Sequence, residues 1–252
     1  MDNLPLKSIL VTGASRGIGR ATAIGAGRRG WSVVVHYHRD AQAASNTVDA
    51  VRNAGGEAIA VAGDVTSERD VIDIFATGRS AFGRLDGVVV NAGIVAPKSM
   101  LADMDITRLR TMFDTNVLGA YLCAREAARY LPRDRGGNGG SIVFVSSASS
   151  RLGSAGEYVD YAGSKGAVDS LTIGLSKELA QVGVRVNAVR PGVTDTEIHA
   201  SGGQPDRAAR LGSMTPMGRA ALPEEIAEAI LWLLSDEASY VTGAMLDVAG
   251  GR

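Results

Sequence analysis

The 252-residue sequence contains a single cysteine, Cys123, so it cannot form an internal disulfide. Cys123 lies in the run YLCAREAARYL, which is typical of a helix that uses cysteine as a small buried residue rather than as a reactive thiol. The chain also has almost no net charge, because its 26 Lys and Arg residues balance its 27 Asp and Glu residues. This balance predicts no nucleic-acid partner and no binding to an anionic membrane.

Long hydrophobic runs are also missing: no stretch approaches the roughly 18 apolar residues that cross a bilayer. The opening MDNLPLKSIL lacks the pattern of a secretion signal, so we expect a cytoplasmic protein. No repeat or linker divides the chain, which predicts a single domain over residues 1–252. A chain of this length can sustain its core without disulfides or structural metals, and we expect no metal site.

Seven short runs rich in β-branched residues predict strands at residues 8–12, 31–37, 57–63, 86–92, 141–147, 184–190 and 244–250. The runs are apolar on both faces, and the segments between them are long enough for crossover helices. We therefore expect an α/β fold of the Rossmann type. It would hold a doubly wound, seven-stranded parallel sheet with helices on both faces and a ligand crevice at the carboxyl ends of the strands.

Residues 194–217 depart from this regular alternation. The segment has weak periodicity and several helix breakers, so it is either a mobile lid over the site or a plain connector.

The first predicted strand runs into TGASRGIG, where Gly13, Gly17 and Gly19 stand at the turn from strand to helix. Glycines let the backbone approach a pyrophosphate closely, and the helix N-terminus stabilises its charge. The context of a first strand and first helix makes this loop a candidate dinucleotide site. The other candidate contacts from this loop are Ser15, Arg16 and Ile18.

The end of the second predicted strand indicates which dinucleotide is bound. An acidic residue commonly holds the ribose 2′-hydroxyl of NAD there, whereas this sequence has Tyr37, followed by His38 and Arg39. Arg39, helped by Arg16, could bind a 2′-phosphate, which favours NADP. Alternatively, Arg39 is only solvated beside the next helix, with Asp40 as its cap.

Two further strand ends fall on the crevice side and could line the adenosine pocket. Their candidate residues are Asp64, Val65, Asn91, Ala92 and Gly93. Asp64 could equally cap the helix that opens at residues 66 and 67.

Tyr161 and Lys165 are four residues apart and follow a strand that ends in serines. On a helix they lie on one face, one turn apart. An ammonium there is expected to lower the pKa of the phenol from about 10, which makes Tyr161 a candidate general acid.

These motifs, with Asn116 and RPG at 190–192 in order, resemble the short-chain dehydrogenase/reductase family nearly from end to end. The resemblance is to its classical subfamily, including bacterial 3-oxoacyl-carrier-protein reductases and glucose 1-dehydrogenases. It implies hydride transfer between NADP(H) and a carbonyl or secondary alcohol. It also implies a homotetramer built through segments 103–131 and 158–182 and the last strand.

The same resemblance implies a catalytic tetrad of Asn116, Ser147, Tyr161 and Lys165. Tyr161 would exchange the proton, Ser147 would orient the substrate oxygen, and Asn116 would hold a water that relays protons through Lys165. The residues implied to bind the nicotinamide carboxamide are Pro191, Gly192, Thr194 and Thr196.

The serine assignment depends on register. The usual family interval of thirteen residues before Tyr161 ends on Ala148, whose methyl group cannot orient a carbonyl. An extra residue in the following loop would restore Ser147, and strand alternation separates it from Ser146.

Other functions remain open from the sequence. Tyr158 lies seven residues before Lys165, a spacing that resembles the enoyl-reducing branch, although TGASRGIG is the carbonyl-reducing form of the loop. A catalytically silent NADP-binding sensor or scaffold is the other alternative. The substrate pocket is expected from residues 148–160 and the 194–217 segment, with Glu157, Tyr158, His199 and Met214 as candidate lining residues. We expect His199 to be a surface residue of the lid rather than a second acid/base.

Overall fold

The computed structural model describes residues 7–252, and its strands form one parallel sheet. They are β1 (Ser8–Val11), β2 (Ser32–Tyr37), β3 (Glu57–Ala62), β4 (Gly87–Val90), β5 (Gly140–Val145), β6 (Val184–Pro191) and β7 (Met245–Val248). Every pairing among them is parallel, in the order β3-β2-β1-β4-β5-β6-β7. The predicted α/β Rossmann-type fold is confirmed.

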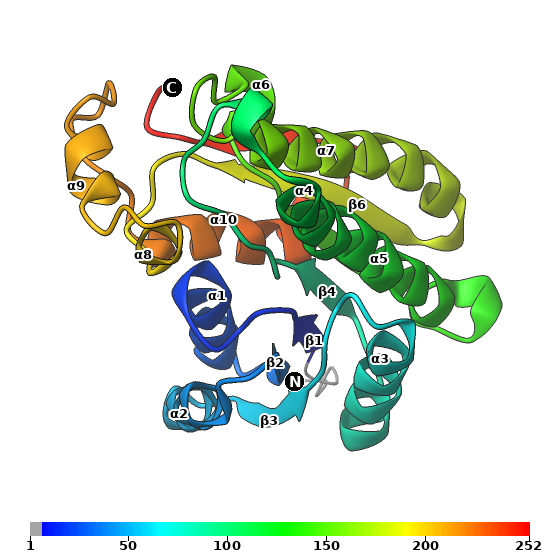
Figure 1. Cartoon of the computed structure of the whole chain (residues 1–252). Helices are drawn as coiled ribbons and strands as arrows, with labels where there is room; N and C mark the ends of the chain where they lie inside the picture. Colours follow the sequence, from blue (N-terminus) through cyan, green and yellow to red (C-terminus); the bar gives the residue numbers. More distant parts are fainter. Residues whose placement is uncertain (1–6) are drawn as a thin grey trace.

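Helices connect the strands and cover both faces of the sheet (Figure 1). They are α1 (Gly17–Gly27), α2 (Ala41–Asn53), α3 (Glu68–Phe82), α4 (Ile106–Phe113), α5 (Gly119–Tyr130), α6 (Ser149–Leu152), α7 (Val159–Leu179), α8 (Ile198–Ser201), α9 (Arg207–Gly212) and α10 (Pro223–Leu234). Short 3-10 turns are η1 (Leu101–Asp103), η3 (Arg133–Arg135), η4 (Ala180–Val182) and η5 (Asp236–Ala238), and a π-helical turn, η2 (Asp114–Leu118), separates α4 from α5.

Alternate strand residues enter two cores, one on each face of the sheet. Ile9 and Val11 of β1 pack with α1, α2 and α10, whereas Leu10 packs with α3, α5 and α7. Removing such a side chain from water stabilises the fold by roughly 1.5–3 kcal/mol. Cys123 of α5 lies in the second core, where burial raises the pKa of its thiol to about 12. It is an unreactive core residue, as expected.

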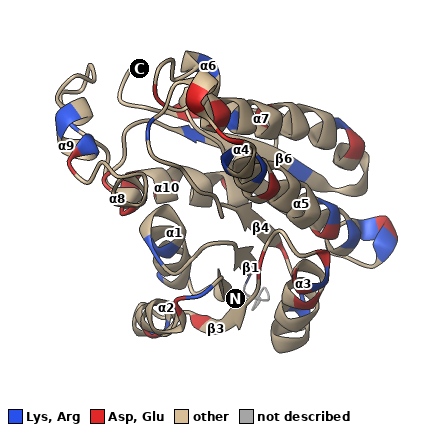
Figure 2. Ribbon diagram, in the orientation of Figure 1, with Lys and Arg blue, Asp and Glu red and all other residues tan. Residues whose placement is uncertain are grey.

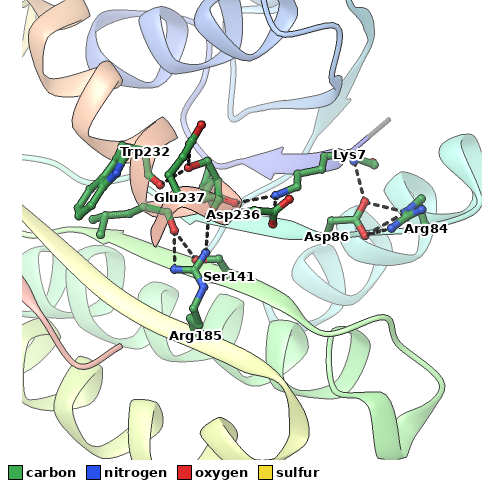
Figure 3. Close-up of polar contacts among 12 residues, drawn as sticks. Lys7, Arg84, Asp86, Ser141, Arg185, Trp232, Asp236 and Glu237 are labelled. Carbon is green, nitrogen blue, oxygen red and sulfur yellow. Dashed lines mark hydrogen bonds and ion pairs between the residues drawn. The ribbon is translucent and has the colours of Figure 1, made fainter. Parts of the chain in front are cut away.

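The amino ends of the strands are closed by a network of polar contacts (Figure 3). Arg185 donates from Nη1 to the carbonyl of Leu233 at 2.8 Å and from Nη2 to that of Ser235 at 2.9 Å. Arg84 pairs with Asp86 at 2.6 Å, and Asp86 also accepts the backbone N–H of Ser8 at 2.9 Å. These contacts join β6 to the end of α10, and β1 to the residue that precedes β4.

Two predicted helix caps have different outcomes. Asp40 caps α2 by accepting the N–H of Ala43 at 2.9 Å. Asp64 does not cap α3, because Ser67 does so by accepting the N–H of Asp70. Asp64 instead accepts the N–H and hydroxyl of Thr66 at 2.9 and 2.8 Å, which fixes the turn before the helix.

Charges of both signs are distributed over the helices, as Figure 2 shows. Within residues 7–252, no helix combines the length and the apolar character needed to cross a bilayer. The same residues contain no group of three or more His, Cys, Asp or Glu side chains placed to hold a metal ion.

The start of α1 packs against the end of β4 without space for a side chain at Gly19. A Cβ atom there would lie 2.6 Å from Nδ2 of Asn91 and closer still to the carbonyl oxygen of Gly13. Both neighbours are fixed, since Asn91 Nδ2 donates to the carbonyl oxygens of Thr12 and Gly13 at 2.8 and 3.1 Å.

We predict that Gly19→Ala lowers the free energy of unfolding by roughly 1–3 kcal/mol, the usual cost of overpacking. Urea unfolding followed by circular dichroism measures the change. The exposed neighbour Arg20 provides the control, because Arg20→Ala should shift stability by no more than about 0.5 kcal/mol. Equal stabilities of the two variants would contradict the close packing.

Candidate active site

A cavity of about 1120 Å³ opens at the carboxyl ends of the strands. Most of the residues from strand ends that line it follow the strands directly, because β1, β3 and β4 end at Val11, Ala62 and Val90, one or two residues before the predicted ends. The sequence-predicted cofactor residues that line it are Gly13, Ser15, Arg16, Gly17, Ile18, His38, Arg39, Asp64, Val65, Asn91, Ala92, Gly93, Tyr161, Lys165, Pro191, Gly192, Thr194 and Thr196.

Two predicted cofactor residues lie elsewhere. Tyr37 packs against the core on the α1 side, whereas its neighbours His36 and His38 line the cavity. This follows from the alternation of side chains along a strand, which the prediction overlooked. Gly19 is likewise outside the cavity lining, and its small size serves the contact between α1 and the Gly13 backbone.

The glycine loop is shaped to receive an anion. Gly13 and Gly17 have φ angles of +64° and +54°, which favour glycine. The N-cap residue of α1, Arg16, makes no side-chain capping bond. The first N–H groups of the helix are therefore left for a ligand, and such a terminus binds phosphate well.

Beneath the loop lies His36, a residue that the sequence analysis did not identify. Its Nδ1 accepts the N–H of Gly13 at 3.1 Å, and its Nε2 lies 3.1 Å from the carbonyl oxygen of Gly63. These contacts assign the proton to Nε2. Burial lowers the pKa of His36, so the neutral ring joins the ends of β1 and β3 through β2.

Cationic side chains gather at the end of the cavity beside the end of β2. Arg16 and Arg39 are exposed at its edge, and Nε2 of His38 lies 3.6 Å from a carboxylate oxygen of Asp64. Although partial burial acts to raise the pKa of Asp64, the hydrogen bonds from Thr66 hold it below its usual value. The carboxylate is thus ionised and already engaged by its own turn.

Tyr161 and Lys165 lie one turn apart on α7, as predicted. Lys165 Nζ is 5.7 Å from the centre of the Tyr161 ring and donates to the carbonyl oxygen of Val145 at 2.7 Å. Burial lowers the pKa of Lys165 to about 8, against the opposing charge of Asp169. Burial also raises the pKa of Tyr161, and a hydrogen bond with Ser147 acts against this. The expected lowering of the Tyr161 pKa by Lys165 is therefore not found, because burial raises this pKa and only the hydrogen bond with Ser147 opposes it.

The two adjacent serines both line the cavity, but their hydroxyl groups have different partners. Ser146 is buried and donates to Oδ1 of Asp169 at 2.6 Å, on the α7 side of β5. Ser147 lies in the cavity beside Tyr161. The loop that follows turns through Gly153, Ser154 and Gly156, all at positive φ, and so has room for the extra residue.

Asn116 lies in the π-helical turn η2 and is only 1% exposed. Its Oδ1 accepts the N–H of Ile94 at 2.8 Å, while its Nδ2 donates to the carbonyl of Ile94 at 2.9 Å. The side chain does not line the cavity, and its amide is engaged by Ile94. Any water that Asn116 holds must bind to its backbone, which a π-helical turn can leave accessible.

The 194–217 segment forms α8 and α9 and covers one side of the cavity. Glu157, Tyr158 and His199 line the cavity as predicted, but Met214 is 74% exposed and lies outside it. His199 is partly buried, and its Nε2 lies 2.9 Å from the carbonyl oxygen of Thr194. Burial lowers its pKa, so it is a neutral residue that contacts the backbone of the same segment.

Comparisons with known proteins agree with this geometry. Residues 13–252 match the family model described as Enoyl-(Acyl carrier protein) reductase. The chain is 49% identical over 243 residues to the uncharacterized oxidoreductase YgfF of Escherichia coli K12, covering 96% of this chain and 98% of that protein. It is 40% identical over 253 residues to an L-rhamnose 1-dehydrogenase (NAD(P)(+)) of Sphingomonas sp. SKA58, with 100% and 98% covered.

A solved structure shows the same fold at full length. The crystal structure of a dehydrogenase/reductase from Sinorhizobium meliloti 1021 superposes with a TM-score of 0.90 at 31% identity, covering 98% of this chain and 95% of that one. The match to the family model extends over almost all of the chain, and the relatives named are oxidoreductases. The chain therefore belongs to the short-chain dehydrogenase/reductase family of oxidoreductases.

Proposed function

We propose that this protein transfers a hydride between NADP(H) and the carbon of a carbonyl or secondary alcohol, with Tyr161 as general acid and base. The observation that carries the proposal is the meeting of Ser147, Tyr161 and Lys165 at the wall of a cavity that the glycine loop also lines. The nicotinamide would supply or accept the hydride when bound. The phosphates of the dinucleotide fit the uncapped N-terminus of α1. The carboxamide of its nicotinamide ring fits the backbone from Pro191 to Thr196.

The protein residues supply the proton chemistry. Burial keeps Tyr161 protonated, which suits donation to a carbonyl oxygen during reduction. Ser147 would bind and orient that oxygen, and its hydroxyl already contacts the phenol. Lys165, with its pKa lowered to about 8, can return a proton to Tyr161 near neutral pH. In the direction of alcohol oxidation, the same groups would act in reverse.

The choice of NADP rests on the charges around the end of β2. Arg16, His38 and Arg39 line the cavity there. Asp40, the nearest carboxylate in sequence, is engaged by the N–H of Ala43 as the cap of α2. A 2′-phosphate would gain charge-assisted hydrogen bonds from the arginines.

We further propose a cytoplasmic homotetramer of single-domain chains, each with a lid at residues 194–217. Supporting this assembly, the long helices expose apolar side chains in the isolated chain: Phe113, Leu118, Tyr121 and Ile173 are each more than 40% exposed. Such a surface is typical of a subunit interface.

The name of the matching family model raises the enoyl-reducing alternative. In that case Tyr158 would serve as the proton donor. The hydroxyl of Tyr158, however, accepts a hydrogen bond from Gln204, and its ring lies 4.8 Å from the guanidinium carbon of Arg207. Tyr158 is thus engaged by the lid, which favours Tyr161 as the donor and reduction of carbonyls.

We predict that Tyr161→Phe lowers kcat by at least ~100-fold and leaves NADPH affinity unchanged, because only the acid is removed. Stopped-flow turnover and NADPH fluorescence titration measure the two quantities. Tyr158→Phe is the matched control and should lower kcat far less. Effects in the opposite order would transfer the proton donor to Tyr158.

We predict that Ser147→Ala lowers kcat/KM by ~10-fold or more with nearly unchanged cofactor affinity, because the substrate oxygen loses a positioned donor. Ser149→Ala should have little effect on kcat/KM. Ser146→Ala should instead lower the urea midpoint, since it removes the hydroxyl that donates to buried Asp169. If Ser149→Ala were the most damaging to turnover, the assignment of Ser147 would be wrong.

We predict that Arg39→Asp lowers the ratio of kcat/KM for NADPH to that for NADH by roughly 10–100-fold, the worth of a hydrogen bond to a charged group. Steady-state kinetics with both cofactors give the ratio. Arg28→Asp makes the same charge change at an exposed residue outside the cavity and should leave the ratio unchanged. An unchanged ratio in the Arg39 variant would argue against 2′-phosphate binding there.

A further inference from the structure

The substrate end of the cavity contains an ion pair between the lid and the loop before α7. Nη2 of Arg207, on α9, lies 2.7 Å from Oε2 of Glu157. The same guanidinium stacks over the ring of Tyr158. Both Arg207 and Glu157 line the cavity that holds Tyr161 and Ser147. Two contacts therefore hold the guanidinium at the wall of the site.

One donor of this guanidinium has no acceptor. Nη1 of Arg207 is buried and makes no hydrogen bond within residues 7–252. The neighbouring lid side chains are paired differently, since Arg210 donates to Oε1 of Gln204 at 2.8 Å and Gln204 donates to the hydroxyl of Tyr158. A buried charged donor without a partner is unfavourable, so Arg207 would gain from an oxygen atom supplied by a ligand.

The charge of the pair indicates what kind of oxygen fits. A hydrogen bond from Arg207 holds the pKa of Glu157 below its usual value, so Glu157 is a carboxylate and neutralises Arg207. A carboxylate on a substrate would be repelled by Glu157 and would have to compete with it for Arg207, although the charges of Arg210 and Lys98 also act there. An apolar substrate would leave the Arg207 donor unpaired. A hydroxyl group suits both residues, because it can accept from Arg207 and donate to Glu157.

From this arrangement we infer that Arg207 and Glu157 select a polyhydroxylated substrate, binding a hydroxyl group remote from the carbon that exchanges the hydride. The inference rests on the proposed function and specifies the substrate class of that reaction. Arg207 is a substrate-binding residue here, and because Nη1 is buried, its guanidinium must turn toward the cavity to meet the ligand.

Three ring alcohols test this directly: myo-inositol, cyclohexanol and 4-hydroxycyclohexanecarboxylate. The first carries a hydroxyl at every ring carbon, the second carries one hydroxyl only, and the third adds a carboxylate. For the wild-type protein with NADP we expect kcat/KM to be highest for myo-inositol, by at least ~10-fold over cyclohexanol.

Arg207→Met keeps the length of the side chain and removes its donors. It should lower kcat/KM for myo-inositol by ~10-fold or more and change that for cyclohexanol by less than ~3-fold.

Arg210→Met is the control for damage to the lid, because Arg210 lies on the same helix outside the cavity lining. It should leave the preference among the three alcohols unchanged. A second variant, Glu157→Gln, removes the repelling charge and should raise kcat/KM for 4-hydroxycyclohexanecarboxylate.

The inference is overturned if Arg207→Met lowers kcat/KM for myo-inositol and cyclohexanol equally, which would mark the ion pair as a purely structural lid contact. It is also overturned if wild-type protein prefers the carboxylated alcohol. Turnover of cyclohexanol alone would refute the substrate class and leave the proposed function standing. Absence of turnover with all three alcohols and their ketones, with either cofactor, would refute the proposed function and the inference with it.

Discussion

The geometry of the site depends on a lysine ammonium that is buried against the central sheet. Removing such a charge from water costs several kcal/mol unless partners replace the water. Here the carbonyl of Val145 accepts from Lys165 at 2.7 Å, and Asp169 supplies the opposite charge one turn further along α7. Asp169 is itself held by Ser146 and by Arg190 of β6. These contacts fix the rotation of α7 on β5, and that rotation brings Tyr161 to Ser147.

The polar groups at the two ends of the sheet have different kinds of partners. At the amino end, Arg185 donates to backbone carbonyls, and Asp86 pairs with Arg84 and accepts the backbone N–H of Ser8. At the carboxyl end, the first N–H groups of α1 have no side-chain cap, and Nη1 of Arg207 has no acceptor within residues 7–252. Because unpaired polar groups are unfavourable, a ligand bound at the carboxyl end would stabilise both of these groups.

The sequence predicted the seven parallel strands well, because apolar runs such as VVV at 33–35 are typical of strands covered on both faces. Alternation does not by itself separate Ser146 from Ser147, because both lie beyond the end of β5 and line the cavity. Tyr37 lies within β2, where alternation directs it to the core instead of the cavity. His36 was missed because a buried histidine between two backbone groups has no sequence signature. The raised pKa of Tyr161 depends on burial, which residue spacing alone does not reveal.

The two halves of the cavity differ in how far the sequence predicts them. The cofactor half is built from strand ends and a helix N-terminus, whose positions follow from the order of the strands, so short motifs predict it. The substrate half depends on contacts between the lid and a distant loop, such as Arg207 with Glu157, which are fifty residues apart and follow no periodicity. Such pairs can change without disturbing the sheet, since they lie at the surface of the fold. In the proposed function, the sheet and α7 therefore set the proton-transfer geometry, while residues 194–217 set the substrate.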